Sequence, residues 1–159
     1  MMPDLSEFNH LPRFPDGRID YTNADKAPGL SCFIRYKDEI LLLKRSDKVM
    51  AYKGQWFCLG GFIDEPKSIR QKALEELHEE LGLSENDIKS IKTAPSYTYQ
   101  DSSAKKSWIL YPVLVELNNQ PEIKLDWEHT DYRWVKKEEL GSFDMPSTLR
   151  EALKKVLWE

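Results

Sequence analysis

Hydrophobic residues in the middle of the chain gather in short runs of the length and composition that β-strands prefer. These runs span residues 29–36, 39–45, 56–63, 93–99, 107–117 and 131–135. Only Lys37 and Asp38 separate the first two runs, so we expect a β-hairpin there. The Gly60-Gly61 pair interrupts the third run and predicts a turn at that point.

Two other segments place apolar residues at the spacing of an α-helix. The first segment ends at about Leu81, because Gly82 suits a left-handed helix cap, and Pro66 suits its first turn. The second runs from about Ser147 to Trp158, with Ser147 as a candidate N-cap. Two helices packed on a sheet predict a mixed α/β or α+β domain.

The first 26 residues are polar, rich in Pro, Asp and Asn, and show no clear periodicity. We interpret residues 1–26 as an irregular N-terminal arm, with a short hairpin around Asp16 and Gly17. Residues 27–159 are expected to form one globular domain. An arm of this kind could take part in a homodimer.

The composition narrows the class of protein. The chain has 159 residues, of which 40% are hydrophobic, enough for one domain with a sizeable core. The net charge is −4 and no basic block is present, which argues against a nucleic-acid duplex or an anionic membrane as partner. No apolar run reaches signal-peptide or membrane-spanning length, so we expect a cytoplasmic protein. Cys32 and Cys58 are expected to be buried free thiols.

Three of the glutamates on the first predicted helix, Glu76, Glu79 and Glu80, stand at positions i, i+3 and i+4. Side chains at i, i+3 and i+4 converge on one side of a helix. At about 100° per residue, Glu76 and Glu80 fall at the edge of the apolar stripe, where the helix meets the rest of the domain. Like charges this close repel one another unless a cation lies between them. The spacing therefore indicates a hard divalent metal, and a metal held by carboxylates usually serves phosphate chemistry.

The segment from Gly61 to Leu83 resembles the signature of the Nudix hydrolases, G-x5-E-x7-R-E-U-x-E-E-x-G-U, where U is a bulky aliphatic residue. The matching positions are Gly61, Glu76, Leu77, Glu79, Glu80, Gly82 and Leu83. The resemblance covers most of residues 27–158, including the strand before the glycines and the late EHTDYRWVKKEEL segment. It implies an α+β fold, an α/β/α sandwich in which helices flank a mixed β-sheet.

Two positions depart from the signature, because Lys67 replaces its first glutamate and Glu75 replaces its arginine. Both charges change sign together. One hypothesis is that Lys67 and Glu75 form the family's ion pair in reverse; the other is that both positions simply drifted. In either case the arginine that orients a neighbouring glutamate in the family is missing from this chain.

The resemblance implies that Glu76, Glu79 and Glu80 are ligands of Mg²⁺, for which Mn²⁺ could substitute, with the carbonyl of Gly60 or Gly61 completing a site. It implies a small-molecule nucleotide pyrophosphate as substrate. The expected reaction cleaves the pyrophosphate bond of a nucleoside diphosphate linked to another moiety, with water attacking phosphorus. Glu76 and Glu79 would be catalytic in this reaction.

A further acidic residue from a distant loop normally joins the metal site in this family, and Glu128 occupies the matching place. Glu128 is therefore a candidate metal ligand or general base. His129 follows it, and in the sugar-nucleotide hydrolases of the same superfamily a histidine here acts as base for attack at sugar carbon. Cleavage of a C–O bond by His129 is thus an alternative. A third interpretation is a non-catalytic domain that binds a nucleotide.

The groups that contact the rest of the substrate are harder to assign from the sequence. Arg45 ends the second predicted strand and matches a position that often faces the phosphates in this family, and Lys44 precedes it. Tyr97 and Tyr99 lie in a strand-like run from which an aromatic ring could stack on a base. The other interpretation of these two tyrosines is packing within the sheet.

Overall fold

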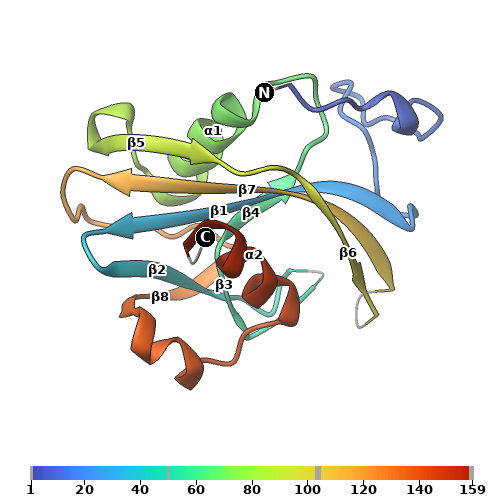
Figure 1. Cartoon of the computed structure of the whole chain (residues 1–159). Helices are drawn as coiled ribbons and strands as arrows, with labels where there is room; N and C mark the ends of the chain where they lie inside the picture. Colours follow the sequence, from blue (N-terminus) through green and yellow to red (C-terminus); the bar gives the residue numbers. More distant parts are fainter. Residues whose placement is uncertain (1, 50, 103–104, 158–159) are drawn as a thin grey trace.

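The computed structural model describes residues 2–49, 51–102 and 105–157, and Figure 1 shows the chain as a mixed sheet with a helix on either side. Within these residues the sheet has eight strands, and its main path runs β3-β2-β1-β7-β5. The strands are β1 (Lys26–Tyr36), β2 (Glu39–Arg45), β3 (Trp56–Phe57), β4 (Leu59–Phe62), β5 (Ile88–Thr93), β6 (Tyr97–Asp101), β7 (Lys106–Leu117) and β8 (His129–Lys136). Strands β1 and β7 are parallel, and the other pairs are antiparallel.

The two helices cover opposite faces of the sheet, as the expected α/β/α sandwich requires. The helices are α1 (Ile69–Leu81) and α2 (Ser147–Leu157). Short 3₁₀ helices also occur at Ser6–Phe8, Glu85–Asp87 and Lys137–Ser142. Because side chains alternate along a strand, Cys32 and Ile34 of β1 pack on the α1 side, whereas Phe33 packs on the α2 side. The predicted fold class is confirmed.

Helix α1 begins and ends where local chemistry fixes it. The Ser68 side chain accepts a hydrogen bond from the Gln71 amide, and the Gln71 side chain accepts one from the Ser68 amide. At the other end Gly82 has φ +70°, as predicted for a left-handed cap. The placement of Pro66 in the first turn was wrong, because this capping box starts the helix after Ser68.

The predicted hairpin between the first two strands is confirmed, with Lys37 at φ +55° in the turn. The sequence pattern missed most of β5, because the isoleucines of this strand, Ile88 and Ile91, do not repeat at a spacing of two. Cys32 and Cys58 are buried free thiols, as expected. No helix in the described part of the chain combines the length and apolarity that a membrane span needs.

The N-terminal segment (blue in Figure 1) packs against the domain through a small core of its own. Phe8, Ile19 and Tyr21 are almost fully buried, and the Tyr21 hydroxyl donates a 2.6 Å hydrogen bond to the carbonyl of Ile63. A bridge between Arg13 and Ile19 closes the hairpin expected around residues 16 and 17. The segment is therefore attached to the chain that leads into α1.

Candidate active site

Gly60 and Gly61 lie inside strand β4, next to α1, so the turn predicted at this pair is wrong: both residues continue the antiparallel ladder with β1. Gly60 lies opposite Ser31 in the β1–β4 ladder, and a β-carbon at Gly60 would approach the Leu30 carbonyl oxygen to 2.9 Å. No side chain fits there without a shift of backbone. A β-carbon at Gly61 would lie 3.3 Å from Oε1 of Glu76, so the Gly61 backbone directly faces this carboxylate.

The three candidate ligands on α1, Glu76, Glu79 and Glu80, occupy different environments. Glu80 is buried, with 4% of its surface exposed, and Glu76 has 13% of its side chain exposed. Glu79 is exposed. The helical spacing predicts that Glu76 and Glu80 lie where the helix meets the rest of the domain, and their low exposure confirms this. Assignment of all three as metal ligands stays a prediction.

The loop before β8 brings three more potential ligands to Glu80. One oxygen or nitrogen atom from each of Glu80, Asp126, Glu128 and His129 can be chosen such that all lie within 4.8 Å of one another. Asp126 shapes this loop, because its side chain accepts a 3.0 Å hydrogen bond from the Glu128 amide. The Glu128 carbonyl in turn accepts a bond from the Ser46 amide at 2.8 Å, which fixes the loop to the end of β2.

These residues fit a divalent cation. Oε2 of Glu80 is buried without a hydrogen-bond partner, and both ring nitrogens of His129 are likewise unpartnered. Burial, reinforced by the neighbouring carboxyls of Glu128 and Glu76, raises the pKa of Glu80 far above its ordinary value. Carboxylate oxygens are ligands suited to Mg²⁺ or Mn²⁺, and a cation bound here would satisfy the unpartnered oxygen of Glu80.

His129 is the first residue of β8 and is buried, with 5% of its surface exposed. Its Nδ1 is 3.8 Å from Oδ1 of Asp126, a distance beyond a hydrogen bond. Burial lowers the pKa of His129, and the nearby Arg45 cation lowers it further, against the opposing effect of Glu128 and Asp126. The imidazole is therefore neutral near pH 7, the form that can accept a proton or bind a metal.

Arg45 and Lys44 lie at the end of β2, where the pairing with β8 shifts register between them. Arg45 then pairs with His129, so its side chain lies near the loop ligands. The guanidinium donates from Nε to the Ala51 carbonyl at 2.8 Å and lies 5.5 Å from the ring centroid of Phe57. Lys44 is partly exposed next to it. Contact of either residue with phosphate stays a prediction.

Tyr97 and Tyr99 lie on the α2 side of the sheet, whereas Glu80 comes from α1. The Tyr99 hydroxyl donates to Oγ of Ser147 at 2.7 Å, and Nζ of Lys155 lies 5.2 Å from the Tyr97 ring centroid. The structure thus does not bring these tyrosines into the group around Glu80. The Tyr97 hydroxyl is nevertheless buried without a hydrogen-bond partner, and a role in substrate binding stays a prediction.

Two separate groups of ion pairs lie near the start of α1, one around Lys67 and one around Lys72. The Lys67 ammonium lies 2.7 Å from Glu75 and 3.2 Å from Glu65, which confirms the expected reversed pair as a contact. Separately, the Lys72 ammonium lies 3.1 Å from Glu76 and 3.7 Å from Asp64. Burial would lower the pKa of Lys72, but the two carboxylates outweigh that effect and raise it.

Sequence reasoning missed Asp126 and Lys72. Asp126 has a recognisable signal, because an aspartate two residues before a loop glutamate commonly caps the turn that presents it. Lys72 could have been found from its i, i+4 spacing to Glu76 on the same helix.

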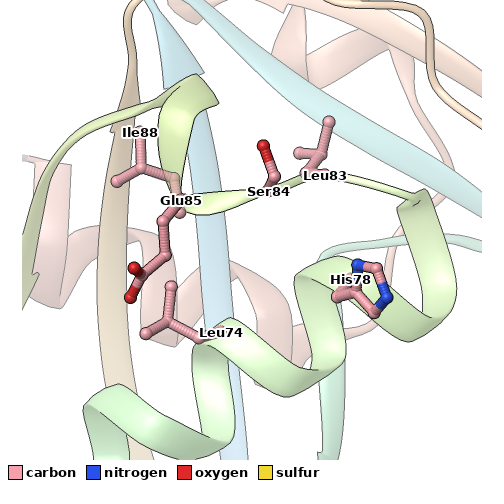
Figure 2. Close-up of a pocket in the computed structure, with 6 residues that line it drawn as sticks. All are labelled: Leu74, His78, Leu83, Ser84, Glu85 and Ile88. Atoms are coloured by element: carbon pink, nitrogen blue, oxygen red, sulfur yellow. The ribbon is translucent and has the colours of Figure 1, made fainter.

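A hollow of about 230 Å³ lies elsewhere, between α1 and the segment that follows it, and Figure 2 shows its lining. The residues are Leu74, His78, Leu83, Ser84, Glu85 and Ile88. None of them belongs to the group around Glu80, so this hollow is not the candidate active site.

Comparison with known proteins identifies the family. The model of the NUDIX domain matches residues 25–157. Nucleoside triphosphatase NudI of Escherichia coli O139:H28 is 29% identical over 125 residues, covering 72% of this chain and 84% of that protein.

Solved structures share the fold. The MutT protein from Methanosarcina mazei Go1 superposes with a TM-score of 0.65 at 24% identity, covering 83% of this chain and 93% of that one. The NUDIX domain of Shewanella oneidensis NrtR, complexed with ADP ribose, gives a TM-score of 0.67 at 18% identity, covering 82% and 85%. With the family match over nearly the whole chain, the protein belongs to the Nudix family and is a pyrophosphohydrolase of the Nudix type.

Proposed function

We propose that this protein is a Mg²⁺-dependent enzyme that cleaves the pyrophosphate bond of a nucleoside diphosphate linked to another moiety, with water attacking phosphorus. The observation that supports this most directly is the convergence of Glu80, Asp126, Glu128 and His129, with ligand atoms within 4.8 Å of one another. Glu80 is buried beside the half-buried Asp126 and Glu128, and carboxylates this crowded are costly unless a cation binds between them. The proposed ligands are these residues, Glu76 and the Gly61 carbonyl.

When bound, Mg²⁺ supplies neutralisation of the phosphate oxygens and lowers the pKa of the attacking water. The side chains position the metal ligands and supply the general base. Glu76 and Glu80 project from one rigid helix, and Glu128 comes from a loop hydrogen-bonded to β2, so their relative positions are fixed before substrate arrives. Glu79 is exposed on the same helix and is the proposed general base, because an exposed carboxylate is open to the attacking water.

The substrate class follows from the family and from the cations near the site. Arg45 sits beside the loop ligands and, with Lys44, is proposed to contact the phosphate that leaves. The NrtR domain binds ADP ribose, which is a nucleoside diphosphate joined to a sugar, and this supports the linked class. NudI acts on nucleoside triphosphates, which supports triphosphates as the second candidate substrate.

Cleavage at sugar carbon with His129 as base is the second candidate reaction. The observation in its favour is a buried, neutral imidazole with both ring nitrogens unpartnered. Attack at phosphorus is preferred because Glu76, Glu79, Glu80 and Glu128 are all retained.

A nucleotide panel tests the proposal. Purified protein is incubated with ADP ribose, nucleoside diphosphate sugars, dinucleoside polyphosphates and nucleoside triphosphates, in Mg²⁺ or in EDTA, and products are separated by chromatography. We expect turnover of a linked nucleoside diphosphate in Mg²⁺ and none in EDTA. Glu80→Gln should abolish turnover, whereas Glu138→Gln, an exposed glutamate outside the site, should retain it.

Three results would contradict the proposal. Full activity in EDTA or in Glu80→Gln would overturn the metal site. Turnover of nucleoside triphosphates alone would favour the second substrate class. Tight binding with no turnover of any nucleotide would favour the non-catalytic alternative.

A further inference from the structure

Lys72 occupies a position between two carboxylates that the Nudix signature does not specify. It precedes Glu76 by one turn of α1, and its Nζ lies 3.1 Å from Oε1 of Glu76. On its other side it lies 3.7 Å from Oδ1 of Asp64. The three side chains are 12%, 13% and 11% exposed, so this ammonium is nearly enclosed by its two partners.

The Glu76 oxygen that meets Lys72 is also the Glu76 atom nearest to Gly61 of β4. Oε1 of Glu76 would lie 3.3 Å from a β-carbon at Gly61, and it is also the atom paired with Lys72. One oxygen of Glu76 is therefore held between the helix and β4. The Glu76 side chain also interacts with the carboxyl of Glu80.

The position that carries the signature arginine cannot hold Glu76 in this chain. Glu75 stands there, and it is engaged with Lys67 at 2.7 Å. An acidic side chain beside Glu76 would repel it rather than orient it. Lys72 supplies the missing positive charge from three residues earlier on the same helix.

We propose that Lys72, held in place by Asp64, is the positioning residue for Glu76 and takes over the task of the missing arginine. The proposal rests on the proposed function, because it concerns a glutamate of the same metal site. In this proposal Lys72 contacts neither the ligands before and at the start of β8 (Asp126, Glu128 and His129) nor the substrate. It acts by fixing the rotamer of Glu76 and by offsetting the repulsion between Glu76 and Glu80.

Asp64 also connects the Lys72–Glu76 ion pair to the N-terminal segment. Its backbone carbonyl accepts a 3.0 Å hydrogen bond from the Ile19 amide, and its carboxylate lies 3.7 Å from Nη1 of Arg18. Arg18 is 46% exposed, so water screens this last ion pair and its contribution is small. The N-terminal segment therefore holds Asp64 mainly through its backbone, and Asp64 in turn holds Lys72.

The test compares three variants on the full-length protein. Lys72→Met removes the charge, Lys72→Arg keeps it, and Lys154→Met removes a lysine that likewise pairs with a glutamate of its own helix, but on α2. Two quantities are measured: kcat and KM on the substrate found by the panel, and the Mn²⁺ dissociation constant by electron paramagnetic resonance of free Mn²⁺. The second readout does not depend on turnover.

Loss of an outer partner of a metal ligand typically costs about 10–100-fold in affinity or rate. We expect Lys72→Met to lower kcat by about tenfold or more and to weaken Mn²⁺ binding, with KM for the nucleotide nearly unchanged. Lys72→Arg should restore most of both losses, and Lys154→Met should match the wild type. In a Glu76→Gln background, Lys72→Met should add nothing further.

Circular dichroism and thermal unfolding in EDTA check that each variant folds, and Lys72→Gln replaces Lys72→Met if the latter does not. Wild-type kcat and Mn²⁺ affinity in the folded charge-removing variant would overturn the proposal, as would failure of Lys72→Arg to recover either quantity. A wild-type protein that neither turns over nucleotides nor binds Mn²⁺ would instead contradict the proposed function itself.

Discussion

The Lys67 ammonium lies 2.7 Å from the Glu75 carboxylate, and this ion pair joins the two positions at which the chain departs from the Nudix signature. The side chains are 31% and 38% exposed, so the pair itself contributes only about 0–1 kcal/mol to stability. Its charge order is the reverse of the family's, while its geometry joins the loop before α1 to the helix. The contact explains how both charges can change together without leaving an unpaired group.

Reversing one charge of this pair should impair the enzyme, and reversing both should not. Lys67→Glu places a third carboxylate beside Glu65 and Glu75, and Glu75→Arg places a cation beside Lys67. We expect each single variant to lower kcat/KM severalfold and the double variant to recover it. A double-mutant cycle on kcat/KM measures the coupling.

Simple additivity of the two changes would show that Lys67 and Glu75 do not act together. In that case both positions drifted independently, and the contact in the structure has no consequence for activity.

Glu80→Gln and Glu79→Gln should both abolish turnover but differ in their effect on the stability of the folded protein. Glu80 is buried among other carboxyls, so Glu80→Gln should raise the free energy of unfolding in EDTA by about 1–3 kcal/mol while abolishing turnover. Glu79 is exposed, so Glu79→Gln should abolish turnover and leave stability within about 0.5 kcal/mol. Urea unfolding in EDTA and in Mg²⁺ measures both effects.

Mg²⁺ should stabilise the wild type against urea and leave Glu80→Gln unchanged, because a ligand that binds only the folded state raises its stability. Destabilisation by Glu80→Gln in EDTA would contradict the view that Glu80 is strained without a cation. Full turnover by Glu79→Gln would remove it as the general base.

The two glycines before α1 should respond differently to alanine. In Gly60→Ala the new β-carbon would meet the Leu30 carbonyl oxygen at 2.9 Å, so we expect a loss of about 1–3 kcal/mol in stability. In Gly61→Ala it would meet Oε1 of Glu76 at 3.3 Å, so we expect a fall in kcat with little change in stability. Thermal unfolding and steady-state kinetics distinguish them; equal effects of both substitutions on both quantities would refute the distinction.

The two thiols should be unreactive in the folded protein. Burial raises the pKa of Cys58 to about 12 and that of Cys32 well above its ordinary value, so neither forms thiolate at pH 8. Ellman's reagent should label neither cysteine in native protein and both in guanidinium chloride. Rapid labelling of one thiol in the native state would show that the core around it opens.

Local patterns determined the parts of the molecule that the sequence predicts well. The spacing of Glu76, Glu79 and Glu80 fixes which of them is buried, because helix geometry is nearly constant. The cap at Gly82 and the hairpin at Lys37 follow from equally local rules.

Long-range packing decided what the sequence could not show. The side of the sheet on which Tyr97 and Tyr99 lie depends on the register of β6 with β7, and a shift of one residue would reverse it. The proximity of Asp126 to Glu80 depends on a loop that follows α1 by more than forty residues of chain. The spacing of Lys72 and Glu76 on one helix predicts their contact. Asp64 precedes the helix, so its contact with Lys72 depends on the folded structure.

Hydrolysis in ¹⁸O-labelled water distinguishes attack at phosphorus from attack at sugar carbon. We expect the group of Glu80, Asp126, Glu128 and His129 to direct water to phosphorus in a nucleotide pyrophosphate. Mass spectrometry of the products from a linked nucleoside diphosphate should find one ¹⁸O in a phosphate group and none in the sugar. Label in the sugar, with unlabelled phosphate, would show attack at carbon and contradict the account.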